Sequence, residues 1–223
     1  MNNLKLRAGF GITGVIPKDP YISLTKYTYG SSYYYSDGKW LPGLSVSSNP
    51  NPDLRWEKST EFNVGLDWSV LDNRLGGSID LYNKKTTDLL FLYTVPTPPK
   101  LYNQTLANAG SVRNQGIAVA VNAVPVRTKD FEWKTVVTVS ANKNKLLSLS
   151  NDMYESNSFK DTGGLGEPIS ISTHRMEEGR ALGEFYGLKS VGVSENGLFL
   201  IEKPDGEVVE FSNDQLKNDV FRL

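Results

Sequence analysis

Asp67 and Asp80 are the residues whose chemistry stands out first, because they lie on two alternating segments joined by a short turn. Two carboxylates held close together could act as the acid and the base or nucleophile of a glycoside hydrolase. Such a pair far more commonly accepts hydrogen bonds from nearby Arg and Lys side chains, and nothing else in the sequence supplies catalytic context. We therefore interpret the pair as structural and expect no enzymatic activity.

Other reactive groups are scarce. The 223 residues contain no cysteine and one histidine, His174, which argues against a thiolate or imidazole metal site and against a Ser-His-Asp triad. The Gly-rich stretch at Gly163 lacks the helix and the Lys of a phosphate loop. The formal net charge of -1 gives no electrostatic basis for binding nucleic acid. We expect no metal, no cofactor and no nucleic-acid partner.

Aromatic side chains are the main candidates for ligand contact. A long connection over residues 14–57 contains "YGSSYYYSDGKW", and a second over 86–114 adds further tyrosines. Aromatic faces pack on the apolar C–H surfaces of sugars, and tyrosine hydroxyls add hydrogen bonds. The alternative, which we favour for the first cluster, is packing against neighbouring loops or a partner protein. The candidates are Tyr33, Tyr34, Tyr35, Trp40, Tyr93 and Tyr102.

These connections join long segments in which apolar and polar residues alternate with a period of two, as in half-buried β-strands. We predict an all-β fold with about five long antiparallel strands, over residues 3–13, 58–71, 74–92, 114–125 and 130–148. Asp72 and Asn73 tolerate the left-handed backbone that a tight hairpin needs. We expect the long connections to be irregular and the chain after residue 150 to hold mostly loop and one small hairpin, within 198–211.

The two faces of the predicted sheet differ in composition. One face carries large apolar groups: Phe62, Val64, Leu66, Trp68, Val70, Ile79, Leu81, Val119, Val121, Trp133, Val137 and Val139. The other carries small polar or acidic groups: Asn63, Asp67, Ser69, Ser78, Asp80, Asn122, Thr138 and Ser140. A β-sandwich would bury the first face under a second sheet, whereas a transmembrane barrel would turn it to lipid and the second face to the lumen.

Connection lengths and strand lengths favour the barrel. Short connections at 71–74 and 124–130 alternate with the two long ones, as periplasmic turns alternate with extracellular loops in outer-membrane barrels. The longest segments exceed the roughly 9 to 11 residues that a tilted strand needs to cross a bilayer. We therefore predict an incomplete, antiparallel up-and-down transmembrane β-barrel. The alternative is a soluble all-β binding module with an aromatic carbohydrate-contacting patch.

One stretch resembles a known family. Residues 51–90, "NPDLRWEKSTEFNVGLDWSVLDNRLGGSIDLYNKKTTDLL", resemble the late barrel region of SusC/RagA-type TonB-dependent outer-membrane transporters. In that family an Asn-Pro-x-Leu-x-Trp-Glu segment leads into a strand. An Asn-Arg-Leu turn follows, and the next strand ends in Tyr-x-Lys-x-Thr-x-Asp-Leu-Leu. Similar stretches follow the family's order at Leu4, Asn108, Phe131 and Gly179.

The resemblance implies that residues 1–223 are part of the barrel domain of such a transporter, from its C-terminal half and without its plug domain. Members form a 22-stranded barrel in the cell outer membrane of Gram-negative, Bacteroidetes-like bacteria. The implied partners are a SusD-type surface lipoprotein, the TonB complex, membrane lipid and an imported oligosaccharide or peptide. The absence of a signal-peptide pattern at Met1 fits a piece of a longer chain.

Overall fold

The computed structural model describes residues 1–17, 19–35, 37–155, 157–166, 172–203, 205–211 and 221–222. The regular elements among them are β-strands, and no helix among them is long and apolar enough to cross a membrane. The chain forms two compact units. The first comprises Met1–Lys143 and Ser148–Ser156, and the second comprises Asn144–Leu147 and Asn157–Leu223.

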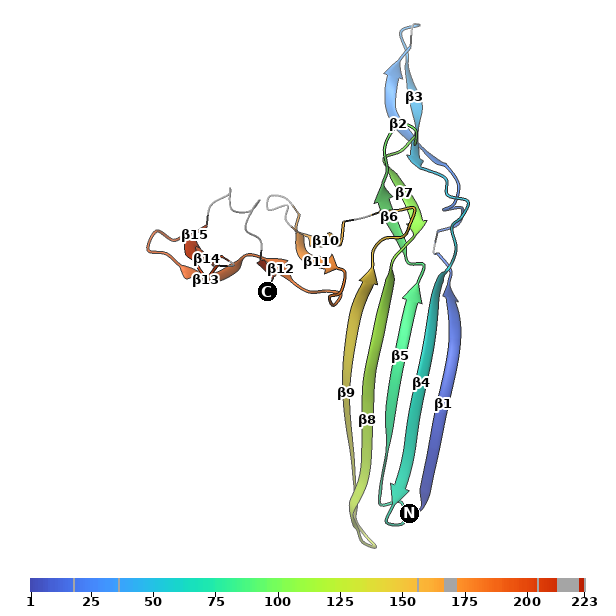
Figure 1. Cartoon of the computed structure of the whole chain (residues 1–223), viewed down its shortest axis with the longest axis vertical. Helices are drawn as coiled ribbons and strands as arrows, with labels where there is room; N and C mark the ends of the chain where they lie inside the picture. Colours follow the sequence, from blue (N-terminus) through green and yellow to red (C-terminus); the bar gives the residue numbers. More distant parts are fainter. Residues whose placement is uncertain are drawn as a thin grey trace. The chain divides into compact units, whose positions relative to one another are not determined.

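A five-stranded antiparallel sheet dominates the first unit (Figure 1). Its spatial order is β1-β4-β5-β8-β9, so that each long strand lies beside the next long strand along the chain. This order confirms the predicted up-and-down segment of an open barrel, with β1 and β9 at its edges. The strands are β1 (Asn3–Val15), β4 (Glu57–Val70), β5 (Leu75–Thr87), β8 (Ser111–Arg127) and β9 (Glu132–Ser148).

The register from β1 to β8 continues without a bulge, so side chains alternate in phase across four strands. Residues that lie directly opposite each other share a face. One row across the apolar face is Leu6, Leu66, Ile79 and Val119. The neighbouring row across the polar face is Arg7, Gly65, Asp80 and Ala118.

The short turn between β4 and β5 has the left-handed backbone that the sequence predicts. The φ angles of Asp72 and Asn73 are 54° and 63°, and the Arg74 amide donates to the Leu71 carbonyl at 3.0 Å. Leu71 is also left-handed, with φ of 52°. The sequence gives no sign of this third position, because leucine has no preference for that conformation.

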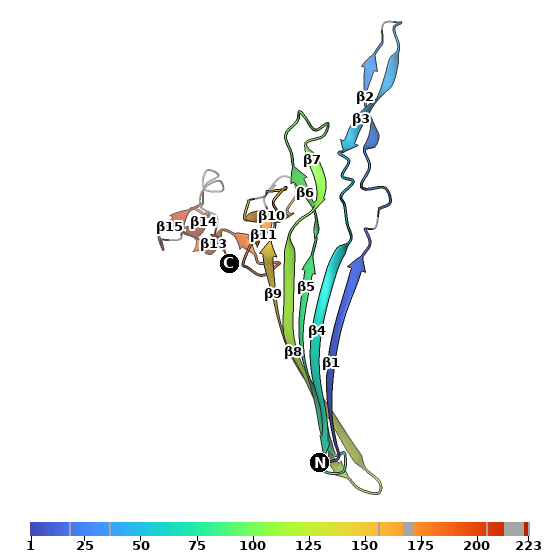
Figure 2. The same cartoon turned by 45° about the vertical axis from the view of Figure 1, so that its right-hand side comes forward.

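The two long connections are not irregular, and that prediction is wrong. The first contains a hairpin of β2 (Lys26–Tyr34) and β3 (Trp40–Ser48), and the second a hairpin of β6 (Leu90–Thr94) and β7 (Gln104–Asn108). Both hairpins leave the same end of the five-stranded sheet (Figures 1 and 2). The same residue types occupy both faces, as adjacent Tyr33 and Tyr34 do on β2 and Ser47 and Ser48 do on β3, so no apolar-polar alternation marks these strands in the sequence.

The strand predicted over 74–92 is in fact two strands. β5 ends at Thr87, because Asp88 adopts a left-handed φ of 58° and redirects the chain into β6. β8 begins at Ser111, three residues before the predicted start. These differences lengthen the hairpin region at the end of the sheet that carries the long connections.

The described residues of the second unit form three small sheets. β10 (Phe159–Gly164) pairs with β11 (Ser172–Glu177), and β12 (Tyr186–Gly187) pairs with β16 (Phe221–Arg222). β13 (Lys189–Val193), β14 (Phe199–Glu202) and β15 (Val208–Glu210) form the third, of which β14 and β15 lie within the predicted 198–211 hairpin.

Arg175 organises the first of these small sheets. Its guanidinium carbon lies 3.9 Å from the centre of the Phe159 ring and 3.6 Å from that of Tyr186, and its Nε donates to Asp161 at 2.6 Å. The hydrogen bonds that Arg175 donates to Asp161 raise the pKa of Arg175. The stacked and paired cation holds β10 and β11 against the segment that follows them.

Candidate functional site

The two carboxylates on the polar face are bridged by one cation. Arg7 on β1 donates from Nε and Nη2 to Asp67 at 2.8 and 2.9 Å, and from Nη2 to Asp80 at 2.8 Å. Because both carboxylates accept from the same guanidinium, neither is placed as a free general acid or base. The geometry therefore matches the structural interpretation of the pair.

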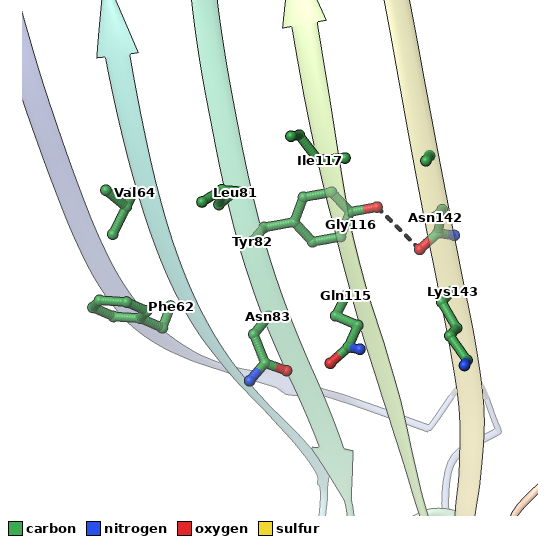
Figure 3. A pocket seen from close by; sticks show the side chains of 11 residues that line it. Phe62, Val64, Leu81, Tyr82, Asn83, Gln115, Gly116, Ile117, Asn142 and Lys143 are labelled. Atoms are coloured by element: carbon green, nitrogen blue, oxygen red, sulfur yellow. Dashed lines mark hydrogen bonds between the residues drawn. The ribbon is translucent and has the colours of Figure 1, made fainter.

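Glycine makes room for this bridge. A Cβ atom at Gly65 would lie 2.5 Å from Asp80 Oδ1 and 2.7 Å from Arg7 Nη2. A similar arrangement occurs at Gly116, where a Cβ would lie 2.6 Å from Tyr82 Oη; the Tyr82 hydroxyl donates to Asn142 Oδ1 at 3.1 Å (Figure 3). The polar face thus carries side chains that lie flat across the backbone over glycines.

We expect Gly65→Ala in the full-length protein to separate Arg7 from Asp80 and to destabilise the sheet by about 1 to 3 kcal/mol, the usual cost of overpacking. Thermal unfolding in detergent micelles measures the effect. Gly11→Ala is the matched control. Gly11, on β1, lies on the same polar face of the sheet as Gly65, and a Cβ there would meet nothing within 4 Å. Equal melting temperatures for the two variants would contradict the role given to Gly65.

A small core fixes the β6–β7 hairpin. Tyr93, Ala107 and Ala109 are buried, and Phe91 and Tyr154 pack against them. The Tyr93 ring lies 5.5 Å from that of Tyr154, and its hydroxyl donates to the Leu149 carbonyl at 2.6 Å. Tyr93 is only 5% exposed, so this candidate has no face available to a ligand and acts in the core instead.

Burial raises the pKa of Tyr93 to about 12. An unfolded tyrosine ionises near pH 10, so the stability that Tyr93 contributes is intact below about pH 10 and falls as the pH rises toward 12. We expect Tyr93→Phe to remove this part of the alkaline destabilisation, and also to lose about 1 kcal/mol at neutral pH with the hydrogen bond. Hydrogen exchange of β6 and β7 between pH 9 and 12 measures it; identical pH profiles for the two proteins would refute it.

Three asparagines fasten the first long connection to the β6–β7 hairpin, and we call Asn49, Asn51 and Asn108 the amide clasp. Asn49 is 2% exposed. Its Nδ2 donates to the carbonyls of Tyr102 and Gln104 at 2.5 and 2.8 Å, and its Oδ1 accepts from the Tyr102 amide at 3.0 Å. The buried side chain of Asn49 therefore forms hydrogen bonds with three backbone groups at the edge of the hairpin.

The other two members of the clasp extend it toward the sheet. Asn51 Nδ2 donates to the Leu106 carbonyl at 2.9 Å. Asn108 Nδ2 donates to the carbonyls of Arg55 and Asp88 at 2.7 and 2.8 Å, and its Oδ1 accepts from the Arg55 amide at 2.7 Å. The Asn-Pro segment that marks the family resemblance is thus a structural joint between two loops.

Glu57 adds a further bond to the joint, since its Oε1 accepts from the Leu90 amide at 3.0 Å. Sequence reasoning did not identify the amide clasp. The signal available was the repeated Asn-Pro at 49–52, because asparagine readily bonds to backbone groups outside regular structure.

The structure brings together only two of the aromatic candidates. Tyr34 and Trp40 lie opposite each other on β2 and β3, with ring centres 5.6 Å apart at 66°. They are 63% and 69% exposed. Tyr33 lies opposite Leu41, on the other face of the hairpin, and Tyr35 follows the end of β2.

The same hairpin exposes two tyrosines that the sequence analysis did not select. Tyr27 and Tyr29 on β2 are 62% and 77% exposed. Tyr102 is half-buried, and its backbone is held by Asn49. Within the ranges that the structure describes, no group of three His, Asp or Glu residues is placed to hold a metal ion.

A family model described as the β-barrel of TonB-dependent receptor-like proteins matches residues 2–176. The chain belongs to the TonB-dependent receptor family. Barrels of this family lie in the outer membrane of Gram-negative bacteria.

Two curated relatives support the membership. TonB-dependent receptor P3 of Formosa agariphila is 34% identical over 195 residues, which are 87% of this chain and 19% of that protein. TonB-dependent receptor SusC of Bacteroides thetaiotaomicron is 33% identical over 202 residues, which are 88% of this chain and 20% of that protein. The chain therefore spans about a fifth of the length of these relatives.

Solved structures agree with the fold. The structure of the RagAB peptide transporter matches with a TM-score of 0.73 and 25% identity, covering 99% of this chain and 23% of that one. The resemblance to SusC/RagA-type receptors is thus confirmed. The relatives are receptors and transporters rather than enzymes, as the sequence led us to expect.

Proposed function

We propose that this TonB-dependent receptor chain forms part of the wall of an outer-membrane transporter that imports oligosaccharides or peptides with a SusD-type lipoprotein and the TonB complex. The division of the five-stranded sheet into an apolar and a polar face is the observation that carries the proposal. Large apolar residues remain exposed on the first face; they include Phe10, Phe62, Leu81 and Val139. Lipid is the medium that such a face fits.

The aromatic residues at the two ends of β4 support this placement. Trp56 precedes β4 and packs over Gly14, where a Cβ would lie 3.0 Å from its ring, and Trp68 is near the short turn. From residue 56 to residue 68 an extended strand rises about 40 Å, which at a tilt of about 40° spans about 30 Å, the thickness of the hydrocarbon core. Tryptophans at both levels suit the two membrane interfaces.

The exposed ring pair of Tyr34 and Trp40 is the best-formed candidate for contact with imported substrate. It lies on a hairpin at the end of the sheet that carries the long connections, which is the extracellular end in barrels of this kind (Figure 2). An edge-to-face pair offers both a flat ring and a hydroxyl, which suits a sugar ring or a peptide side chain.

We expect the double variant Tyr34→Ala/Trp40→Ala in the full-length protein to bind substrate about five- to tenfold more weakly, the size of one aromatic contact. Calorimetry with mixed oligosaccharides and with a peptide digest measures it. Phe131→Ala, at the short-turn end, is the control. Unchanged affinity for every ligand, with loss of a co-purifying lipoprotein, would assign the pair to the partner instead.

The wider proposal is tested in the source bacterium. The full-length protein should fractionate with the outer membrane, and a surface lipoprotein should co-purify with it. Deletion of its gene should abolish uptake of one substrate class. Recovery of the protein in a soluble fraction would support the soluble binding module and overturn the transporter.

A further inference from the structure

Toward the long connections, the apolar face of the sheet carries a group of cations. Lys85 on β5 lies opposite Arg113 on β8. Lys58 on β4 comes two residues before Thr60, which lies opposite Lys85. Alternate residues of a strand lie on the same face, so these cations share the face of Phe62, Leu81 and Ile117. With Lys143 on β9 they form a set that we call the basic belt: Lys58, Lys85, Arg113 and Lys143.

A shallow groove on the apolar face reaches the belt at Lys143. Its volume is about 660 Å³, and most of its lining side chains belong to that face. Figure 3 shows one row formed by Val64, Leu81 and Ile117 and a parallel row formed by Asn83, Gln115 and Lys143. Lys143 is the belt residue that lines the groove, and Lys85 and Arg113 lie two residues beyond the lining residues Asn83 and Gln115 on the same face.

The positive charge of the belt is not neutralised by the described part of the chain. None of the four cations takes part in an ion pair there, and all four side chains are exposed. Their same-face neighbours across the pairs are neutral; they are Gly14, Thr60 and Thr87. On the opposite face at this height, Glu61 lies opposite Lys84, so charges of both signs occur together.

We propose that the basic belt binds the phosphate groups of a phosphorylated lipid in the outer leaflet, with an acyl chain lying in the groove over Phe62, Val64 and Leu81. This inference rests on the membrane placement proposed above. Lysines at a membrane surface attract anionic headgroups, and the planar guanidinium of Arg113 can bind phosphate through two donors. A group of cations next to an apolar groove fits an amphiphile better than a soluble anion or a folded partner.

The test uses the full-length protein extracted from the outer membrane in mild detergent. Native mass spectrometry counts the phosphorylated lipid that each barrel retains, and titration with the purified lipid gives its affinity. Each cation near an anionic surface contributes about fivefold to binding. We therefore expect Lys85→Gln/Arg113→Gln to weaken binding about 25-fold, whereas Lys84→Gln, one residue away on the polar face, should leave it unchanged.

Two further arms identify the source of the phosphate and separate this inference from the proposed function. Removing the phosphates from the lipid should weaken its binding to the unaltered protein as strongly as the double substitution does. Inorganic phosphate at millimolar concentration should not displace the lipid; displacement would mean that the belt is an anion site. If the protein fractionates with the outer membrane but the double variant retains lipid like the unaltered protein, the inference fails and the transporter proposal stands.

Discussion

Val64→Arg in the full-length protein should destabilise the membrane-inserted barrel by about 2 to 4 kcal/mol, the range for a cation on the lipid face near the bilayer midplane. Val64 lies opposite Ala8 on β1 and Leu81 on β5, in the middle of the apolar face. The residues directly beside Val64 on that face, Ala8, Leu81 and Leu66, are all apolar. Urea-induced unfolding in lipid vesicles, followed by tryptophan fluorescence, measures the loss.

Asn63→Arg is the matched control, because Asn63 is the adjacent residue on the polar face of the same strand. Asn63 is exposed and lies opposite Gly9 and Tyr82. An Arg at this position can extend into a wet lumen, so we expect a cost below about 1 kcal/mol. Similar costs at the two positions would mean that the faces do not meet different media, and the barrel account of this sheet would fail.

Asn49→Ala should release the β6–β7 hairpin from the first long connection. The side chain of Asn49 makes three hydrogen bonds from a buried position, so we expect a loss of about 3 kcal/mol in local stability, at about 1 kcal/mol for each bond. Hydrogen exchange at the Tyr102 amide should then be more than about 100-fold faster, since 1.4 kcal/mol corresponds to a factor of ten.

Asn103→Ala serves as the control in the same loop. Its side chain is exposed and forms no hydrogen bond to the described residues, although its carbonyl accepts from the Val95 amide. This variant should exchange like the unaltered protein. Protection at Tyr102 that survives Asn49→Ala would show that the core around Tyr93, rather than the amide clasp, positions the hairpin.

The sequence predicted the five-stranded sheet well because its two faces differ in composition. Apolar and polar residues alternate along each strand, and Phe62 with Asn63 already shows this period of two. The left-handed Asp72 and Asn73 were predictable for a local reason, because their side chains tolerate that backbone.

The hairpins of the long connections could not be predicted in the same way. Tyr33 and Tyr34 lie on opposite faces of β2, and both are exposed, so side-chain type does not report the strand. The break after Thr87 depends on one left-handed residue, Asp88, inside an otherwise continuous alternating stretch. The burial of Tyr93 depends on contacts with distant residues, which spacing along the chain does not reveal.

The amide clasp holds its neighbours by their main chain. Asn49, Asn51 and Asn108 donate to carbonyl oxygens, which every amino acid possesses. Side chains at the tips of the hairpins can therefore be exchanged over generations while the hairpins keep their positions. Exposed residues of the hairpins can therefore change without altering the scaffold that positions them.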